Sequence, residues 1–265
     1  MKAFYRLAAL FIAVIAFSSC EKVIDLNLKD AAPQLVIEGS IINTAHFPTV
    51  SISRTVGFNE PSNFRGVSGA TVRITSGSTM PVILTESSPG IYQGLTVIGR
   101  PGRTYTLQVD VDGQTYKASS TMPSQVAIDS IGVEDVGFRG KIEKNVIVYY
   151  SDPPNVKNQY RFILSVNGKL ITRVFARNDE FNDGRAVRVA LYQDDVDIKS
   201  GDKLDIELQS IDERIYTYWF TFSKQSGEAM GNASVAPTNP PNNFDKPVLG
   251  YFSAHAVNRR TVIVK

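Results

Sequence analysis

Short runs in which apolar and polar residues alternate, separated by turn dipeptides, make up most of this sequence. TVSISR at 49–54 and TYTLQVDV at 104–111 are examples, and both are rich in β-branched or aromatic residues. Successive side chains of a β-strand point to opposite faces, so each run offers one face to a core and the other to water. Asp112-Gly113, directly after the second run, is a dipeptide that two-residue hairpin turns favour. The sequence therefore predicts a mainly β chain.

A proline-containing segment, STMPSQVAIDSI, divides the alternating runs into two groups. No helical period precedes it, and we expect residues 33–123 to form an N-terminal β-sandwich domain. The runs that follow are longer, QYRFILSVNG and KLITRVFAR among them, and Asn167-Gly168, where these two meet, predicts a second tight hairpin. Two-faced strands suit antiparallel sheets with one solvated side. We expect residues 124–265 to form a second sandwich-like (Ig-like) domain, which ends in the closing strands VLGYFSAHAV and RRTVIVK.

One segment of the second domain has a helical period instead. Its apolar residues share one stripe of a helix. The stripe consists of Ile211, Ile215, Tyr218, Trp219 and Phe222. The spacing predicts a helix near residues 211–226, with Ser210 or Asp212 at its N-cap and Gly227 at its end.

The aromatic residues of the predicted helix fall into two groups, according to whether they lie on the apolar stripe. Trp219 and Phe222 lie on the stripe, so we expect them in the core. Tyr216 and Phe220 lie off it, four residues apart, and are the candidates for contact with a partner or ligand.

The N-terminus has the three-part layout of a secretory signal. Lys2 and Arg6 precede an apolar run at 7–17, which is shorter than the about 20 residues of a membrane-spanning helix. Ser18 and Ser19 then lead to Cys20, the only cysteine, so the thiol has no disulfide partner in this chain. FSSC resembles the site at which bacterial lipoproteins are cut and lipidated.

We therefore expect residues 1–19 to be a lipoprotein signal peptide and residues 20–32 a tether. Cys20 would carry a diacylglycerol, and several acyl chains on one residue hold a domain firmly at a membrane. Removing residues 1–19 leaves 26 basic against 26 acidic residues. A balanced chain offers no electrostatic basis for binding nucleic acid.

Residues suited to catalysis are few. A nucleophile needs a base, usually histidine, and the chain has only His46 and His255. No Gly-x-Ser-x-Gly motif is present. His255 lies in an apolar strand pattern, where a hydrogen-bonded structural role is expected, and His46 lies in a turn that we expect to be solvated. Two histidines and one lipidated cysteine also argue against zinc, so we predict no catalytic residue and no cofactor besides the lipid.

Calcium needs only oxygen ligands, and two acidic segments contain candidate ligands. A loop that begins at Asn178 fails the calcium-loop register, because its sixth position is Asp183 and its twelfth is Val189. Asp194, Asp195 and Asp197 could ligate an ion from one loop, although turns between strands are commonly acidic, and we predict no metal. A carboxylate pair for glycoside hydrolysis is set by distance in space, and the sequence singles out none.

Four segments of the C-terminal half resemble a known family by their order. They are NDEFNDG at 178–184, SGDKLDIELQSIDERIYTYW at 200–219, GNASVAPTNPPNN at 231–243 and LGYFSAHA at 249–256. Together with the lipidation site, they resemble the Bacteroidetes outer-membrane lipoproteins known as domain of unknown function 4249 (DUF4249). Genes of this family usually lie beside those of TonB-dependent receptors, and the family has no established enzymatic activity.

The resemblance implies a non-enzymatic lipoprotein, anchored in the outer membrane and exposed at the cell surface. Its expected role is ligand capture for, or docking to, a TonB-dependent transporter. Two alternatives stay open: a structural or adhesive surface module, and a carbohydrate-active enzyme.

Overall fold

A computed structural model of the chain describes residues 32–57, 64–138, 141–193, 196–225 and 238–265. Residues 1–31, with Cys20, lie outside the described residues, and so does Gly227. Within the described part, no helix has the length and apolarity to span a membrane.

The strands before the proline-containing segment follow the predicted alternation. They are β1 (Leu35–Ile42), β2 (Thr49–Arg54), β3 (Arg65–Gly66), β4 (Thr71–Thr75), β5 (Val82–Ser88), β6 (Ile91–Gln93), β7 (Thr104–Val111) and β8 (Gln114–Thr121). In β7, Tyr105, Leu107, Val109 and Val111 are buried, and the residues between them are half-buried or exposed. The β7–β8 turn places Asp112 and Gly113 at φ 52° and 70°, as a tight hairpin turn requires, which confirms that prediction.

The second group of elements contains longer strands and a helix. They are β9 (Ile128–Phe138), β10 (Lys141–Ser151), β11 (Gln159–Val166), β12 (Lys169–Leu170), β13 (Phe175–Asn178), β14 (Ala186–Leu191), β15 (Lys203–Ile211), α2 (Glu213–Gln225) and β16 (Leu249–Ile263). The mainly β class with a helix at the expected place is confirmed, and a β-sandwich is consistent with this arrangement. Asn167 and Gly168 have φ 51° and 80°, which confirms the second tight turn.

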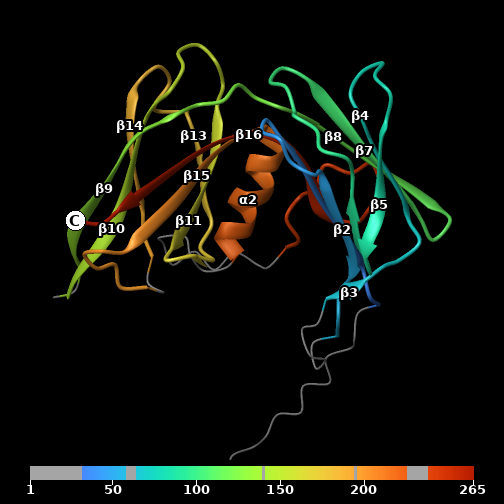
Figure 1. Ribbon diagram of the computed structural model, residues 1–265, viewed down its shortest axis with the longest axis horizontal. Coiled ribbons are helices and arrows are strands. Elements are labelled where there is room, and N and C mark those ends of the chain that lie inside the picture. Colours follow the sequence, from blue (N-terminus) through green and yellow to red (C-terminus); the bar gives the residue numbers. More distant parts are fainter. Residues whose placement is uncertain (1–31, 58–63, 139–140, 194–195, 226–237) are drawn as a thin grey trace, which may run out of the picture. The chain divides into compact units, whose positions relative to one another are not determined.

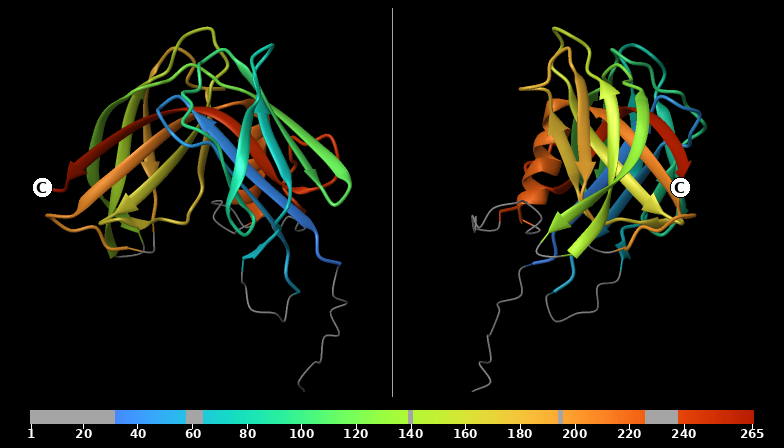
Figure 2. Two further views of the ribbon diagram at one scale, coloured as in Figure 1. Left: turned by 45° about the vertical axis from the view of Figure 1, so that its right-hand side comes forward. Right: turned by 90° about the vertical axis from the view of Figure 1, so that its left-hand side faces the viewer.

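Strand β16 joins strands of both groups into one sheet, and β14, β10 and β9 form a second sheet (Figure 1). The order of the main path is β12-β11-β15-β16-β1-β2-β6-β5-β4-β7-β8. The first half of β16 pairs with β1 in parallel, from Val36 opposite Leu249 to Ile42 opposite His255. Its second half pairs with β15 in antiparallel register, from Ser210 opposite Ala256 to Lys203 opposite Ile263. The left view of Figure 2 shows β16, in red, as one long strand.

The apolar faces of these strands form two cores. The first is built by β1, β2, β4 to β8 and the first half of β16, and Ile37, Leu107 and Phe252 are completely buried in it. The second lies between the sheet β14-β10-β9 and strands β11 and β15. Met122 is the last first-core residue before the chain enters the second core at Val126, and residues 244–256 then return to the first.

Three local predictions were wrong. VLGYFSAHAV and RRTVIVK form one strand, because the main chain changes partner from β1 to β15 without a break. KLITRVFAR is not one strand but the two short strands β12 and β13, each paired with β11. The helix begins at Glu213, so Ile211 belongs to β15 and not to the helical stripe.

Asp212 is the N-cap of α2, one of the two residues predicted for that place. Its Oδ1 accepts a hydrogen bond of 3.0 Å from the N–H of Ile215, the third residue of the helix. The helix then packs on β11, β13 and β16, across the sheet face opposite the cores (Figure 1). Ile215 and Tyr218 are its buried residues.

Candidate functional site

The residues predicted from sequence are scattered. Cys20, Asp194 and Asp195 lie outside the described residues, and Asp197 is exposed. Tyr216 and Phe220 stack on each other on α2, with ring centroids 5.5 Å apart, and Phe220 is 39% exposed. The structure thus leaves Phe220 open to a partner, and their contact role stays a prediction.

The core positions expected on α2 were wrong, because the helix covers the outer face of the sheet and neither Trp219 nor Phe222 belongs to the two cores. Trp219 is half-buried against the sheet, but Phe222 is 41% exposed. Phe222 lies one turn nearer the C-terminal end of the helix, and its ring meets only the edge of Trp219, at 5.8 Å between centroids, among the described aromatic rings.

Three carboxylates gather where β10 ends and the loop after β13 begins. One ligand oxygen from each of Asp152, Asp179 and Asp183 lies within 4.8 Å of the others. Their donors are groups of the chain itself: the Tyr160 hydroxyl to Asp152 at 2.5 Å, and the Asn158 N–H to Asp179 at 2.7 Å. Burial raises the pKa of Asp152. Because these carboxylates accept hydrogen bonds from the chain itself, we interpret the cluster as closing the loop after β13.

A different site lies on the outer face of the sheet, beside α2. Period two turns Phe252, Ala254 and Ala256 of β16 into the first core, so Tyr251, Ser253 and His255 face outward. A cavity of about 190 Å³ opens there between β1, β11, β15, β16 and α2. We call it the Arg161 pocket. Its walls include Arg161, Glu207, Gln209, Trp219, Tyr251 and His255.

Arg161 of β11 is held under the helix by Trp219. Its guanidinium carbon lies 3.5 Å from the centroid of the Trp219 ring, within the range of a cation–π contact. Tyr251 of β16 meets the Trp219 ring edge-on at 5.2 Å between centroids. Burial lowers the pKa of Arg161, opposed by the nearby Tyr251 and Glu207. The guanidinium stays charged because its normal pKa lies far above neutrality.

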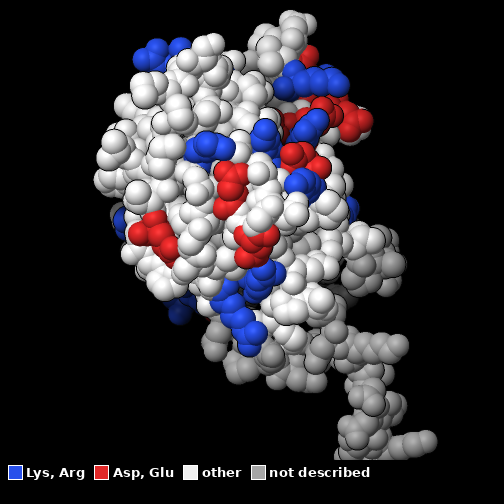
Figure 3. All heavy atoms as spheres, turned by 90° about the vertical axis from the view of Figure 1, so that its right-hand side faces the viewer, with Lys and Arg blue, Asp and Glu red and all other residues white. Residues whose placement is uncertain are grey.

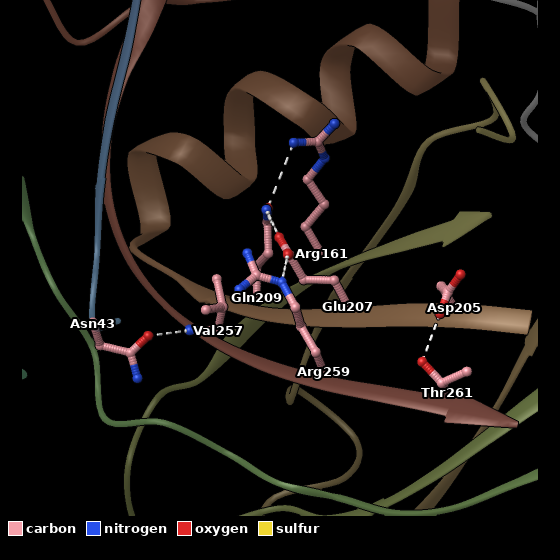
Figure 4. Close-up of polar contacts among 8 residues, drawn as sticks. All are labelled: Asn43, Arg161, Asp205, Glu207, Gln209, Val257, Arg259 and Thr261. Carbon is pink, nitrogen blue, oxygen red and sulfur yellow. Dashed lines mark hydrogen bonds and ion pairs between the residues drawn. The ribbon is translucent and has the colours of Figure 1, made fainter. Parts of the chain in front are cut away.

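A chain of hydrogen bonds crosses the wall of the pocket (Figure 4). Gln209 accepts from Arg161 at 3.5 Å and donates to Glu207 at 2.6 Å. The second oxygen of Glu207 accepts from Nε of Arg259, also at 2.6 Å. Gln209 is 5% exposed, so the polar groups of this wall are oriented before any ligand arrives.

His255 and Ser253 form the buried floor. Nδ1 of His255 lies 2.9 Å from the Ser253 hydroxyl oxygen. Burial lowers the pKa of His255 to about 4, so the imidazole is neutral at physiological pH. A histidine of such low basicity is a poor general base, and Ser253 is 2% exposed. The pair therefore suits a fixed donor and acceptor for a ligand better than a nucleophile.

Two of the other cavities have fewer buried polar side chains in their walls. One of about 130 Å³ near Met80 and Ile98 is lined by apolar side chains, hydroxyl-bearing residues and two exposed arginines, Arg100 and Arg103. One of about 590 Å³ is bordered by the proline- and asparagine-rich segment at 239–242 and by Arg54. Neither gathers buried polar side chains as the Arg161 pocket does.

Sequence reasoning missed most of the pocket. His255 was expected to be a hydrogen-bonded structural residue, and its bond to Ser253 fits that expectation. His46, expected to be solvated, is exposed at the rim. Arg161 and Gln209 are opposite each other across the β11–β15 ladder, a relation that no local pattern reveals.

Comparison with protein families decides the family. The model described as "Domain of unknown function (DUF4249)" matches residues 21–261. The chain belongs to this family. The match includes every element that lines the Arg161 pocket, so the pocket is part of the DUF4249 domain itself.

Other comparisons add little. No curated protein matches the sequence. Among solved structures, a two-domain fibronectin type III segment from chicken tenascin is similar at 15% identity, over 67% of this chain and 90% of that one, with a TM-score of 0.21. A likeness at that score has no bearing on function.

Proposed function

We propose that this DUF4249 protein is a non-enzymatic lipoprotein of the Bacteroidetes outer membrane, which captures a ligand for a TonB-dependent transporter at the cell surface. The signal-like residues 1–19 and the single cysteine, Cys20, support the anchor. The resemblance of the chain to lipoproteins encoded beside such receptors supports the partner.

The observation that carries ligand capture is the Arg161 pocket. Binding sites for small molecules are concave and hold a few fixed polar groups among hydrophobic and aromatic ones. Here Arg161, Gln209 and His255 converge beside the rings of Trp219 and Tyr251. The weakly basic His255 favours binding over hydrolysis.

Anchorage makes a weak partnership sufficient. A lipoprotein and a receptor in the same membrane meet at a high effective concentration, so even a weak mutual affinity keeps them together. The receptor then receives a ligand that the lipoprotein has already bound.

The anchor and the partner are tested with the full chain in a bacterium of the proposed group. We expect a fatty-acid label on the wild-type protein and none on Cys20→Ser, which would also leave the membrane fraction. A large barrel receptor should co-purify with wild type in mild detergent. Recovery of the labelled protein alone would contradict the transporter role, and an unlabelled protein would contradict the anchor.

One observation favours the alternative of an adhesive module. Met80 is 89% exposed and Leu95 is 82% exposed, and both lie in loops that connect strands of the N-terminal group. Figure 3 shows a broad area without charged residues on the side of β4, β5, β7 and β8. Under this alternative, Met80→Ser with Leu95→Ser would abolish cell adhesion and leave receptor co-purification unchanged.

A further inference from the structure

The Arg161 guanidinium has no carboxylate partner within the described residues. It donates hydrogen bonds to Gln209 at 3.5 Å and to the hydroxyl of Tyr251, and its flat face is covered by Trp219. Glu207, the acid in the pocket wall, has one oxygen bonded by Gln209 and the other by Arg259. Guanidinium has five N–H donors, so Arg161 keeps donors for a ligand.

The charges of the pocket sum to one positive charge. Arg161 and Arg259 contribute two, Glu207 removes one, and His255 is neutral at physiological pH. Glu38 of β1 lies near Arg161 but does not line the cavity; burial raises the pKa of its carboxyl group, and the charge of Arg161 lowers it by less. A ligand with a single negative charge would balance this site.

The volume of the Arg161 pocket and the polar groups that line it narrow the class of ligand further. About 190 Å³ is several times the about 30 Å³ of a water molecule and less than the about 300 Å³ of the smallest drug-sized pockets. Ser40, Ser253 and His255 add neutral hydrogen-bonding groups at the floor. Such groups match hydroxyls, and a planar carboxylate matches the fork of an arginine.

We infer that the Arg161 pocket binds a small hydroxylated carboxylate, of the size of a single sugar acid, with its carboxylate on Arg161. This inference rests on the proposed ligand-capture role of the pocket. A phosphate ester fits less well, because its second negative charge would lie beside Glu207 without a further cation.

The sole tryptophan of the chain, Trp219, provides a direct probe. The full-length protein in mild detergent is titrated with D-glucuronate, D-glucose and D-glucose 6-phosphate, and the fluorescence of Trp219 is recorded. We expect a saturable change with glucuronate and at least about tenfold weaker binding of the other two, because a charge-assisted hydrogen bond to the carboxylate is lost or opposed. Equal binding of glucose or of the phosphate, or no binding of glucuronate, would overturn the inference.

Variants locate the ligand, with calorimetry as the measurement because a change at Arg161 alters the surroundings of Trp219. Arg161→Met should weaken glucuronate binding at least about tenfold. Arg188→Met, which removes an exposed arginine of β14 that pairs with Glu134 of β9, should leave the affinity for glucuronate unchanged. Equal affinity of Arg161→Met and wild type would place the ligand elsewhere.

A measurement without a variant covers the case in which Arg161→Met does not fold. In an NMR spectrum of the isotope-labelled wild-type protein, one arginine side-chain Nε–H resonance should shift when glucuronate is added and should not shift with glucose. No shift would reject the site. Loss of receptor co-purification with glucuronate binding intact would reject only the transporter role, so the two proposals fail separately.

Discussion

Replacing Asp212 with alanine is expected to lower the free energy of unfolding by about 2–4 kcal/mol. Asp212 does two things at once. It caps α2 through Ile215, and its Oδ2 accepts hydrogen bonds from the Ser120 hydroxyl and, at 3.2 Å, from the N–H of Thr121. One side chain thus connects the last strand of the N-terminal group to the helix beside the Arg161 pocket.

The magnitude follows from these contacts. Loss of an N-cap costs about 1 kcal/mol. Ser120 is 2% exposed, and its hydroxyl also accepts the Ala254 N–H at 2.9 Å, so the orphaned donor stays buried. A buried donor without an acceptor costs about 1–3 kcal/mol. Thr121 is exposed, so water replaces its bond and little is added.

Urea unfolding measures the loss, followed by far-UV circular dichroism and by Trp219 fluorescence. Asp212→Asn keeps an acceptor oxygen for the cap and should lose about half as much. Glu213→Ala, an exposed residue in the same helical turn, should lose less than about 0.5 kcal/mol. The reasoning would be refuted if Asp212→Ala lost no more than Glu213→Ala at an unchanged denaturant slope.

Three further predictions concern β16 and its neighbours. The pKa of His255 falls from 6.5 to about 4 on folding, so the unfolded chain binds a proton that the folded chain does not. Stability should therefore decrease by on the order of 3 kcal/mol as the pH falls through this window, and His255→Gln should abolish that part of the pH dependence of urea unfolding. Gly250 has φ +95°, and an added Cβ would lie 2.1 Å from a carbonyl oxygen of β1. Gly250→Ala should therefore lower the free energy of unfolding by about 3 kcal/mol or prevent folding. Gly113→Ala, where the added Cβ would meet open space, should lower it by about 1 kcal/mol, as measured by thermal unfolding. Asn243 makes three hydrogen bonds to the main chain, two of them to Phe252; Asn243→Ala should cost about 2–4 kcal/mol and speed amide exchange at Phe252, and unchanged exchange would contradict this.

Features that depend on a few neighbouring residues could be predicted from the sequence. The hairpin turns at Asp112-Gly113 and Asn167-Gly168 follow from the residues that tolerate positive φ. The strands follow from period two, and α2 follows from its apolar spacing and a capping acid. The family match over residues 21–261 agrees with the motifs of the C-terminal half.

Features that depend on residues far apart in the sequence could not be predicted from it. Nothing local states that β1 pairs in parallel with β16, more than 200 residues away, or that one strand crosses from the first core to the second. For the same reason the core positions of Trp219 and Phe222 were misjudged, since a helical stripe does not say which face of a sheet the helix covers.

The amino-acid sequence by itself determined the β class, the turns, the helix and the family, because each depends on local conformational preference or on a motif. Only the tertiary structure decided that Arg161, Trp219, Gln209 and His255 share one pocket. They come from β11, α2, β15 and β16, and strand pairing across large sequence separations is what brings four elements to one place.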